Sequence, residues 1–161
     1  MSVENVKKYL SAYGLADRVI EFTVSSATVA LAAQALGCEE AHIAKTLSFM
    51  QDGKAVLIVM AGDARIDNPR YKLRFSQKAK MLTPDEAIEF TGHAVGGVCP
   101  FALPEGVTVY LDESLLRFET VYPAAGTSSS AVRLTPAELE TASRSAGWVD
   151  VCKGWRPEEQ A

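Results

Sequence analysis

The chain has few of the residues that build a metal centre or a disulfide framework. Only three cysteines and two histidines occur among its 161 residues. Cys38, Cys99 and Cys152 lie far apart in the sequence and form no Cys-x-x-Cys pair, which favours reduced thiols. His42 and His93 have no second ligand at helical or ribbon spacing, so a structural zinc site is not expected. The sequence therefore predicts a protein without a metal, and no cofactor is expected.

Long apolar runs are also absent. No stretch approaches the ~20 apolar residues that span a bilayer, and the N-terminus lacks the basic and apolar blocks of a signal peptide. These absences predict a cytoplasmic location and no membrane contact. Hydrophobic residues nevertheless make up 48% of the chain, which is enough for a substantial core. We therefore expect residues 1–161 to form a single domain.

The net charge of -4 argues weakly against indiscriminate nucleic-acid binding, but the charge is unevenly distributed. Between residues 65 and 80 lie six of the sixteen basic residues and one of the twenty acidic residues, which leaves ten basic against nineteen acidic residues elsewhere. The basic residues of this strip are Arg65, Arg70, Lys72, Arg74, Lys78 and Lys80. The strip is either a confined contact for a polyanion or a solvated helix face.

Apolar periodicity, caps and turn residues predict interleaved helices and strands. Helices are expected over residues 2–13, 25–36, 70–75, 83–92 and 135–145, and strands over 18–23, 43–50, 55–61, 80–82, 107–111, 120–122, 131–134 and 148–151. Ser25 or Ser26 is the expected cap of the second helix, and the polar tail from Lys153 is expected to fray. Asp52-Gly53 is a strong hairpin signal. The predicted fold class is α+β, with a curved, mixed, mostly antiparallel sheet and helices packed outside.

The densest cluster of unusual residues runs from Thr91 to Phe101 and contains three glycines, a histidine, a cysteine and a proline. Gly96 and Gly97 allow positive φ or a close approach to the backbone. Their N–H groups could converge on an anion or a developing oxyanion, or the segment could be a tight turn between a helix and a strand. Cys99 and His93 also supply the residue types of a cysteine hydrolase.

Lys45 lies in a strand whose period places it with apolar residues. Ile43, Leu47 and Phe49 share its face, whereas Thr46 lies on the other. Such a lysine either extends to the sheet edge or projects into a polar pocket. A run of small residues from Ala124 to Ser130 could likewise form a flexible turn or line a pocket.

Several motifs follow one another in order along almost the whole chain. They are Ala35-Leu36-Gly37, Ile43-Ala44-Lys45-Thr46-Leu47, Gly62-Asp63-Ala64-Arg65-Ile66-Asp67, Thr83-Pro84-Asp85-Glu86, Gly92 to Phe101, and Ala125-Gly126-Thr127 before Leu134-Thr135-Pro136. This combination resembles the YbaK/ProX family of aminoacyl-tRNA deacylases, which includes the editing domain inserted in bacterial prolyl-tRNA synthetases. The resemblance implies a sheet approaching a barrel, with a small amino-acid pocket at its mouth.

The resemblance also implies a set of site residues. Lys45, Gly96 and Gly97 fall on catalytic positions, and the basic strip would bind the tRNA acceptor end. Substrate-binding positions are expected at Thr46, His93, Val98, Gly126, Thr127 and Ser128. One departure is Ala131, where some members carry an acidic residue, and this departure bears on amino-acid specificity.

The implied reaction is hydrolysis, in trans, of the ester of a mischarged tRNA. The amino acid would be small, such as Ala, Cys, Ser or Thr, and the tRNA would be tRNA-Pro. The expected partners are the 3′ acceptor end of aminoacyl-tRNA and prolyl-tRNA synthetase. The alternative within the same fold is a non-catalytic module that binds tRNA or a synthetase.

Overall fold

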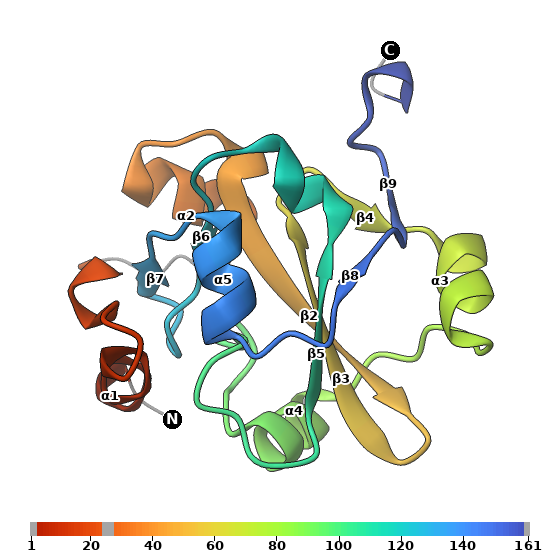
Figure 1. Cartoon of the computed structure of the whole chain (residues 1–161), viewed down its shortest axis with the longest axis horizontal. Helices are drawn as coiled ribbons and strands as arrows, with labels where there is room; N and C mark the ends of the chain where they lie inside the picture. Colours follow the sequence, from red (N-terminus) through yellow and green to blue (C-terminus); the bar gives the residue numbers. More distant parts are fainter. Residues whose placement is uncertain (1–2, 24–27, 160–161) are drawn as a thin grey trace.

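A computed structural model describes residues 3–23 and 28–159, and its centre is a mixed five-stranded sheet of order β6-β2-β3-β5-β8 (Figure 1). These strands are β2 (Ile43–Gln51), β3 (Lys54–Ala61), β5 (Thr108–Asp112), β6 (Tyr122–Pro123) and β8 (Trp148–Val149). The β2–β3 pair is antiparallel, whereas β6 with β2, β3 with β5, and β5 with β8 pair in parallel. The mixed α/β fold is thus confirmed, with a larger parallel share than the sequence predicted.

The β2–β3 hairpin turns where the sequence predicted it. Asp52 and Gly53 both have positive φ, 52° and 78°, which is the backbone that a two-residue hairpin favours. From Ala55 onward every residue of β3 is buried, because this strand has a partner on each side. The central strand therefore anchors the core.

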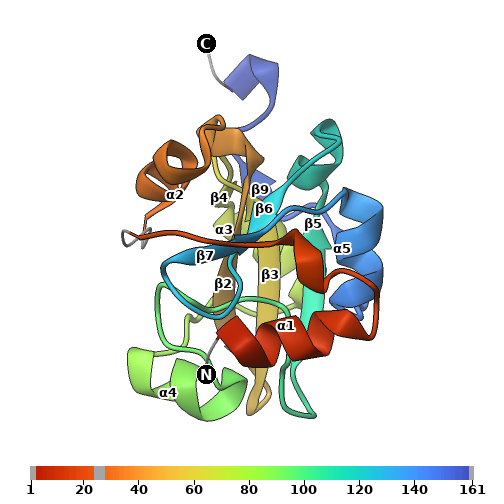
Figure 2. The same cartoon turned by 90° about the vertical axis from the view of Figure 1, so that its left-hand side faces the viewer.

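Two short strand pairs lie outside the central sheet. In the first, β1 (Val19–Glu21) pairs with β7 (Ser130–Val132), and in the second β4 (Arg65–Ile66) pairs with β9 (Cys152–Lys153). A bridge between Ala124 and Ala131 joins β7 to the end of β6. The first pair therefore continues the central sheet, and β7 turns across its face (Figure 2).

In the part of the chain that the structure describes, five α-helices surround the sheet (Figures 1 and 2). They are α1 (Val3–Ser11), α2 (Val29–Leu36), α3 (Asn68–Phe75), α4 (Pro84–Thr91) and α5 (Pro136–Ala142). Thr83 and Thr135 form the capping boxes that the sequence predicted. The cap of α2 is Thr28, whose hydroxyl accepts from the N–H of Leu31; the predicted caps Ser25 and Ser26 lie outside the described residues. Among the described helices, none is both long and apolar enough to cross a bilayer.

The segment from Lys80 to Leu82 is not the strand that the sequence predicted. It contacts β2 through one bridge, Phe49 to Met81, with two hydrogen bonds. The N–H of Met50 donates to the Lys80 carbonyl at 2.8 Å, and the N–H of Leu82 donates to the Ser48 carbonyl at 3.0 Å. The segment therefore covers only the last part of the outer edge of β2.

The predicted fraying of the C-terminal tail is also wrong as far as residue 159. Cys152 and Lys153 form β9, and the helical turn η4 (Pro157–Glu159) follows. Arg156 forms an ion pair with Asp150 at 2.7 Å. The polar composition of the tail did not reveal that β9 pairs with the distant strand β4.

Candidate active site

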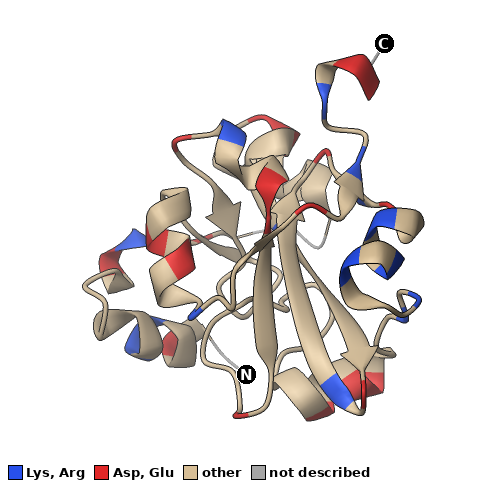
Figure 3. Ribbon diagram, turned by 45° about the vertical axis from the view of Figure 1, so that its right-hand side comes forward, with Lys and Arg blue, Asp and Glu red and all other residues tan. Residues whose placement is uncertain are grey.

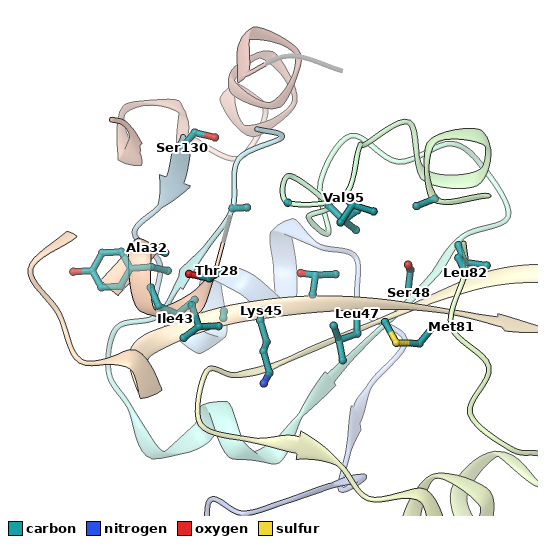
Figure 4. A pocket seen from close by; sticks show the side chains of 18 residues that line it. Thr28, Ala32, Ile43, Lys45, Leu47, Ser48, Met81, Leu82, Val95 and Ser130 are labelled. Carbon is teal, nitrogen blue, oxygen red and sulfur yellow. The ribbon is translucent and has the colours of Figure 1, made fainter. Parts of the chain in front are cut away.

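A cavity of about 320 Å³ opens beside β2. Figure 2 shows α2 and α4 on the same side of the molecule with β2 between them, and both helices contribute to its walls. Its lining includes Thr28, Ala32, Lys45, Ser48, Val95 and Ser130 (Figure 4). Nine of the eighteen lining residues are Gly, Ala, Ser or Thr, and the volume of the cavity suits a small ligand.

The cavity lies where the central sheet lacks a strand. On its outer edge, β2 pairs with β6 only at Ile43 and Ala44. Farther along, the Lys80–Leu82 segment begins its contacts at Ser48. The intervening residues 45–47 have no strand on this edge among the described residues, and they line the cavity.

Lys45 projects from β2 on the face opposite Ser48 (Figure 4). Its side chain is half-buried, and its Nζ donates to the Gly62 carbonyl at 3.5 Å. Burial lowers the pKa of Lys45, and the nearby Asp63 carboxylate opposes this by raising it. Lys45 thus contributes to the cavity lining, and its ammonium lies beside the turn that follows β3 rather than running out to solvent.

The glycine loop places Val95, Gly96 and Val98 on the cavity wall. Gly96 has a φ of 94°, whereas Gly97 is outside the left-handed region. Gly97 is instead needed for space, since a Cβ there would lie 2.8 Å from the Gly126 carbonyl oxygen. Its N–H donates to the Ala94 carbonyl at 2.9 Å. The Gly97 amide is therefore already bonded in the turn, which corrects the expectation that it faces an oxyanion.

The small-residue connection contributes other residues than those expected. Ala124 and Ser130 line the cavity, whereas Gly126, Thr127 and Ser128 do not. Thr127 Oγ1 lies 2.8 Å from Ser130 Oγ, which closes the turn on itself. Two residues of this segment therefore line the cavity, but not the three that the sequence predicted.

His93 and Cys99 do meet, but inside the core. Both are fully buried, and Cys99 Sγ lies 3.5 Å from His93 Nε2. The Phe101 carbonyl lies 2.8 Å from that nitrogen, which therefore carries the proton and donates to it. Burial raises the pKa of Cys99 to about 12, so the thiol is neutral. Neither residue lines the cavity, which corrects the substrate-binding role expected of His93 and removes the cysteine-hydrolase alternative.

The model of the aminoacyl-tRNA editing domain matches residues 23–142. The chain belongs to the aminoacyl-tRNA editing domain family. This confirms the resemblance to YbaK/ProX proteins that the motifs indicated.

Individual relatives cover nearly all of the editing domain. This chain is 49% identical over 156 residues to the uncharacterized protein YwhH of Bacillus subtilis (strain 168). The match covers 96% of this chain and 99% of the relative. A solved structure of a proposed trans-editing enzyme for prolyl-tRNA synthetase is 32% identical, with a TM-score of 0.86 over 96% of this chain and 99% of that one. A hypothetical protein of known structure is 30% identical, with a TM-score of 0.82 over 92% and 99%.

Lys and Arg gather on α3 and the segment after it (Figure 3), and their contacts divide the basic strip into two groups. Arg70 forms an ion pair with Asp150 at 2.9 Å, and the Arg74 guanidinium lies 5.4 Å from the centre of the Tyr110 ring. By contrast Lys72 and Lys78 are exposed and border a second hollow beside α3. Arg65 and Lys80 are exposed as well, and Lys80 directly precedes the cavity residues Met81 and Leu82.

The turn beside Lys45 is fixed by a cluster that we call the C-terminal clamp, made of Asp63, Arg117, Phe118, Trp155 and Arg156. The Arg117 guanidinium donates to both Asp63 carboxylate oxygens, at 3.0 and 2.5 Å. It also lies over the rings of Phe118 and Trp155, 4.7 and 4.9 Å from their centres. Arg156 lies over the Trp155 ring at 4.3 Å. The C-terminal segment thus holds the turn whose Gly62 carbonyl accepts from Lys45.

Proposed function

We propose that this editing domain is a trans-acting deacylase that hydrolyses the ester of a small amino acid mischarged on tRNA. The observation that carries the proposal is a half-buried lysine in the lining of a cavity at an open strand edge, where half of the lining residues are Gly, Ala, Ser or Thr. Membership of the editing family supports the reaction class. The protein would act as a single domain in the cytoplasm and contribute to translation fidelity.

The reaction requires only positioning and electrostatic stabilisation. Water, or a group of the substrate itself, adds to the ester carbonyl, and the bond to the terminal ribose oxygen breaks to release amino acid and tRNA. In this proposal the Lys45 ammonium holds groups of the 3′-terminal nucleotide, and the amides of Gly96 and Val98 are candidate donors to the developing oxyanion. No acyl-enzyme is required, consistent with the neutral, buried Cys99 thiol.

Substrate size and the tRNA partner are finer parts of the same proposal. Ala32, Ala44 and Ala124 leave room for the side chain of Ala, Ser, Cys or Thr. Assignment to tRNA-Pro, and to prolyl-tRNA synthetase as a partner, is supported by the description of the related trans-editing structure. The exposed lysines 72, 78 and 80 would contact acceptor-end phosphates.

The test is a deacylation panel with Ala-, Ser-, Cys- and Thr-tRNA-Pro, followed as release of the amino acid. We expect wild-type protein to release at least one of them and the Lys45→Ala variant to release none. Retention of aminoacyl-tRNA on a native gel without any release would identify the alternative, a non-catalytic binding module. Equal turnover by a folded Lys45→Ala protein would remove Lys45 from the mechanism.

A further inference from the structure

The open stretch of β2 presents the main chain of one residue to the cavity. On this edge the Ser48 carbonyl accepts from Leu82 and the Met50 N–H donates to Lys80. Because main-chain groups alternate between the two edges of a strand with a period of two residues, the N–H and C=O of Thr46 point to the same edge. Here they open into the cavity between β6 and the Lys80–Leu82 segment.

Thr46 also carries an unpaired side-chain group. Its Oγ1 is buried and has no hydrogen-bond partner among the described residues. Its main-chain N–H and C=O likewise make no hydrogen bond on the open edge within residues 3–23 and 28–159. Buried polar groups are nearly always paired, and Thr46 adds two open main-chain groups to its buried, unpaired hydroxyl. Together these groups on one cavity residue indicate a ligand with matching donors and acceptors.

An aminoacyl ester has the matching pair. Its α-ammonium donates, its carbonyl oxygen accepts, and one Cα separates them, as in a residue of a β-strand. In an antiparallel sheet, two directly opposed residues exchange both N–H···O bonds. We propose that Thr46 anchors the aminoacyl group as a one-residue strand partner, its C=O accepting from the α-ammonium and its N–H donating to the ester carbonyl.

This inference rests on the proposed deacylase function and makes it more specific. The Gly97 amide is bonded to Ala94, so the Thr46 amide supplies a donor to the ester oxygen that the loop glycine cannot. Side chains of directly opposed strand residues lie on the same face of a sheet. The substrate side chain therefore lies on the face of Thr46 and Ser48, opposite the Lys45 side chain (Figure 4). The residues that would select the amino-acid side chain and the Lys45 side chain thus lie on opposite faces of β2.

The experiment uses 3′-alanylamido-3′-deoxyadenosine, in which an amide replaces the ester and prevents hydrolysis. Amide hydrogen exchange of the ¹⁵N-labelled protein is measured by NMR with and without the analogue. We expect exchange at Thr46 to slow by about tenfold or more on saturation, as a new hydrogen bond requires. The amide of Gly97, which is already bonded, is the internal control and should not change. Unchanged exchange at Thr46 with bound analogue, or no binding at millimolar concentration, overturns the inference.

Two matched changes separate main chain from side chain. The propionylamido analogue lacks the α-ammonium and should bind about tenfold more weakly or worse, because a charged hydrogen bond is lost. Equal affinity for both analogues contradicts the pairing. Thr46→Val removes the hydroxyl and keeps the main chain, and we expect it to retain protection at residue 46. Loss of binding in a folded Thr46→Val protein would show that the hydroxyl is the anchor and overturn the inference.

Hydrogen exchange and analogue affinity are measured without turnover, so the Thr46 anchor and the deacylase function can be refuted independently of each other. Protection of Thr46 in a protein that releases no amino acid in the deacylation panel supports the anchor and refutes the deacylase. Release with an unprotected Thr46 amide supports the deacylase and refutes the anchor.

Discussion

At the scale of single residues, burying the charged side chain of Lys45 costs stability, although the same side chain is proposed to bind the 3′-terminal nucleotide. Burial lowers its pKa from 10.5, so the folded state binds its proton less tightly than the unfolded state does. The resulting cost to stability is complete below the folded pKa and decreases as the pH rises from there toward 10.5. A neutral residue of similar length should therefore stabilise the fold at neutral pH.

Lys45→Met tests both aspects in one protein. We expect it to abolish deacylation and to raise the thermal midpoint at pH 7, with the gain over wild type shrinking at pH 10. Deacylation assays and thermal unfolding at both pH values check this. Lys54→Met, at an exposed position in the β2–β3 hairpin, should leave turnover and midpoint unchanged. A lower midpoint for Lys45→Met at pH 7 would contradict the burial argument.

Cys99 has a side chain that can act as a nucleophile, but its position in the core makes it unreactive. Because its thiol is buried and neutral, Cys99→Ala should leave the rate of amino-acid release unchanged at temperatures where the variant is folded. The variant should be less stable, by about 1 kcal/mol, since a buried sulfur is removed. Single-turnover deacylation and urea unfolding measure the two effects. A rate loss of about a hundredfold or more in folded protein would restore the thiol to the mechanism.

At the scale of elements, the glycine loop depends on its contact with the turn at Gly126. A Cβ at Gly97 would meet the Gly126 carbonyl oxygen at 2.8 Å and the Thr127 Cα at 2.9 Å, and both are main-chain atoms. Gly97→Ala should therefore push the loop outward, reduce stability by about 1 to 3 kcal/mol and weaken turnover through the displaced Gly96 and Val98.

Gly106→Ala is a suitable control for that prediction. Gly106 has a φ of 92° and open space where a Cβ would be, so the substitution adds backbone strain without a clash. It should cost about 1 kcal/mol and leave turnover intact below its midpoint. Thermal midpoints and single-turnover deacylation rates of both variants test this prediction. Normal turnover in folded Gly97→Ala would show that the glycine loop does not contribute to deacylation.

Three lysines of the basic strip, Lys72, Lys78 and Lys80, are exposed beside α3 and the cavity, and we propose that they contact phosphates. Replacing Lys72, Lys78 and Lys80 together by Gln should weaken tRNA binding and reduce the slope of log K against log salt by about 2. Gln at Lys8, Lys54 and Lys153 removes the same charge from exposed positions elsewhere and should change the slope little. The affinity for tRNA, measured across a series of salt concentrations, tests this. Equal slopes in the two variants would show that the basic strip is only a solvated face.

Local signals in the sequence predicted most elements of this fold, because the groups that fix them are close in the chain. The caps at Thr83 and Thr135 and the turn at Asp52-Gly53 each act within a few residues. The parallel partners of β2 and β5 depend on segments far away in sequence, and no local pattern encodes them.

The same division applies to the candidate site. Strand alternation predicted the face on which Lys45 lies, because it needs only the period of β2. The open edge at Thr46 could not be predicted, since it exists where two distant segments fail to meet. His93 was misplaced because its loop folds back, so that the ring donates to the Phe101 carbonyl inside the core.

At the scale of the whole molecule, the C-terminal clamp connects the end of the chain to the lysine. Arg117→Ala should remove the two hydrogen bonds to Asp63 and both ring contacts, and Trp155→Ala should remove its stacking partner. We expect each to cost about 1 to 3 kcal/mol and to lower kcat, because the Gly62 turn is released. Lys7→Ala breaks an exposed ion pair with Glu21 as a control and should change little. Unaltered kcat in both clamp variants would show that the clamp serves stability alone.

The gap in the central sheet also bears on how the protein avoids self-association. Bare strand edges are templates for the strands of other molecules, and long ones promote aggregation. Here the bare stretch covers residues 45–47, with β6 closing one end and the Lys80–Leu82 segment closing the other. A strand from another molecule needs several residues in register to gain stability, and only three residues are open on this edge in the described part of the chain. The chain can therefore leave backbone groups open to a small guest without presenting a long bare edge at this place.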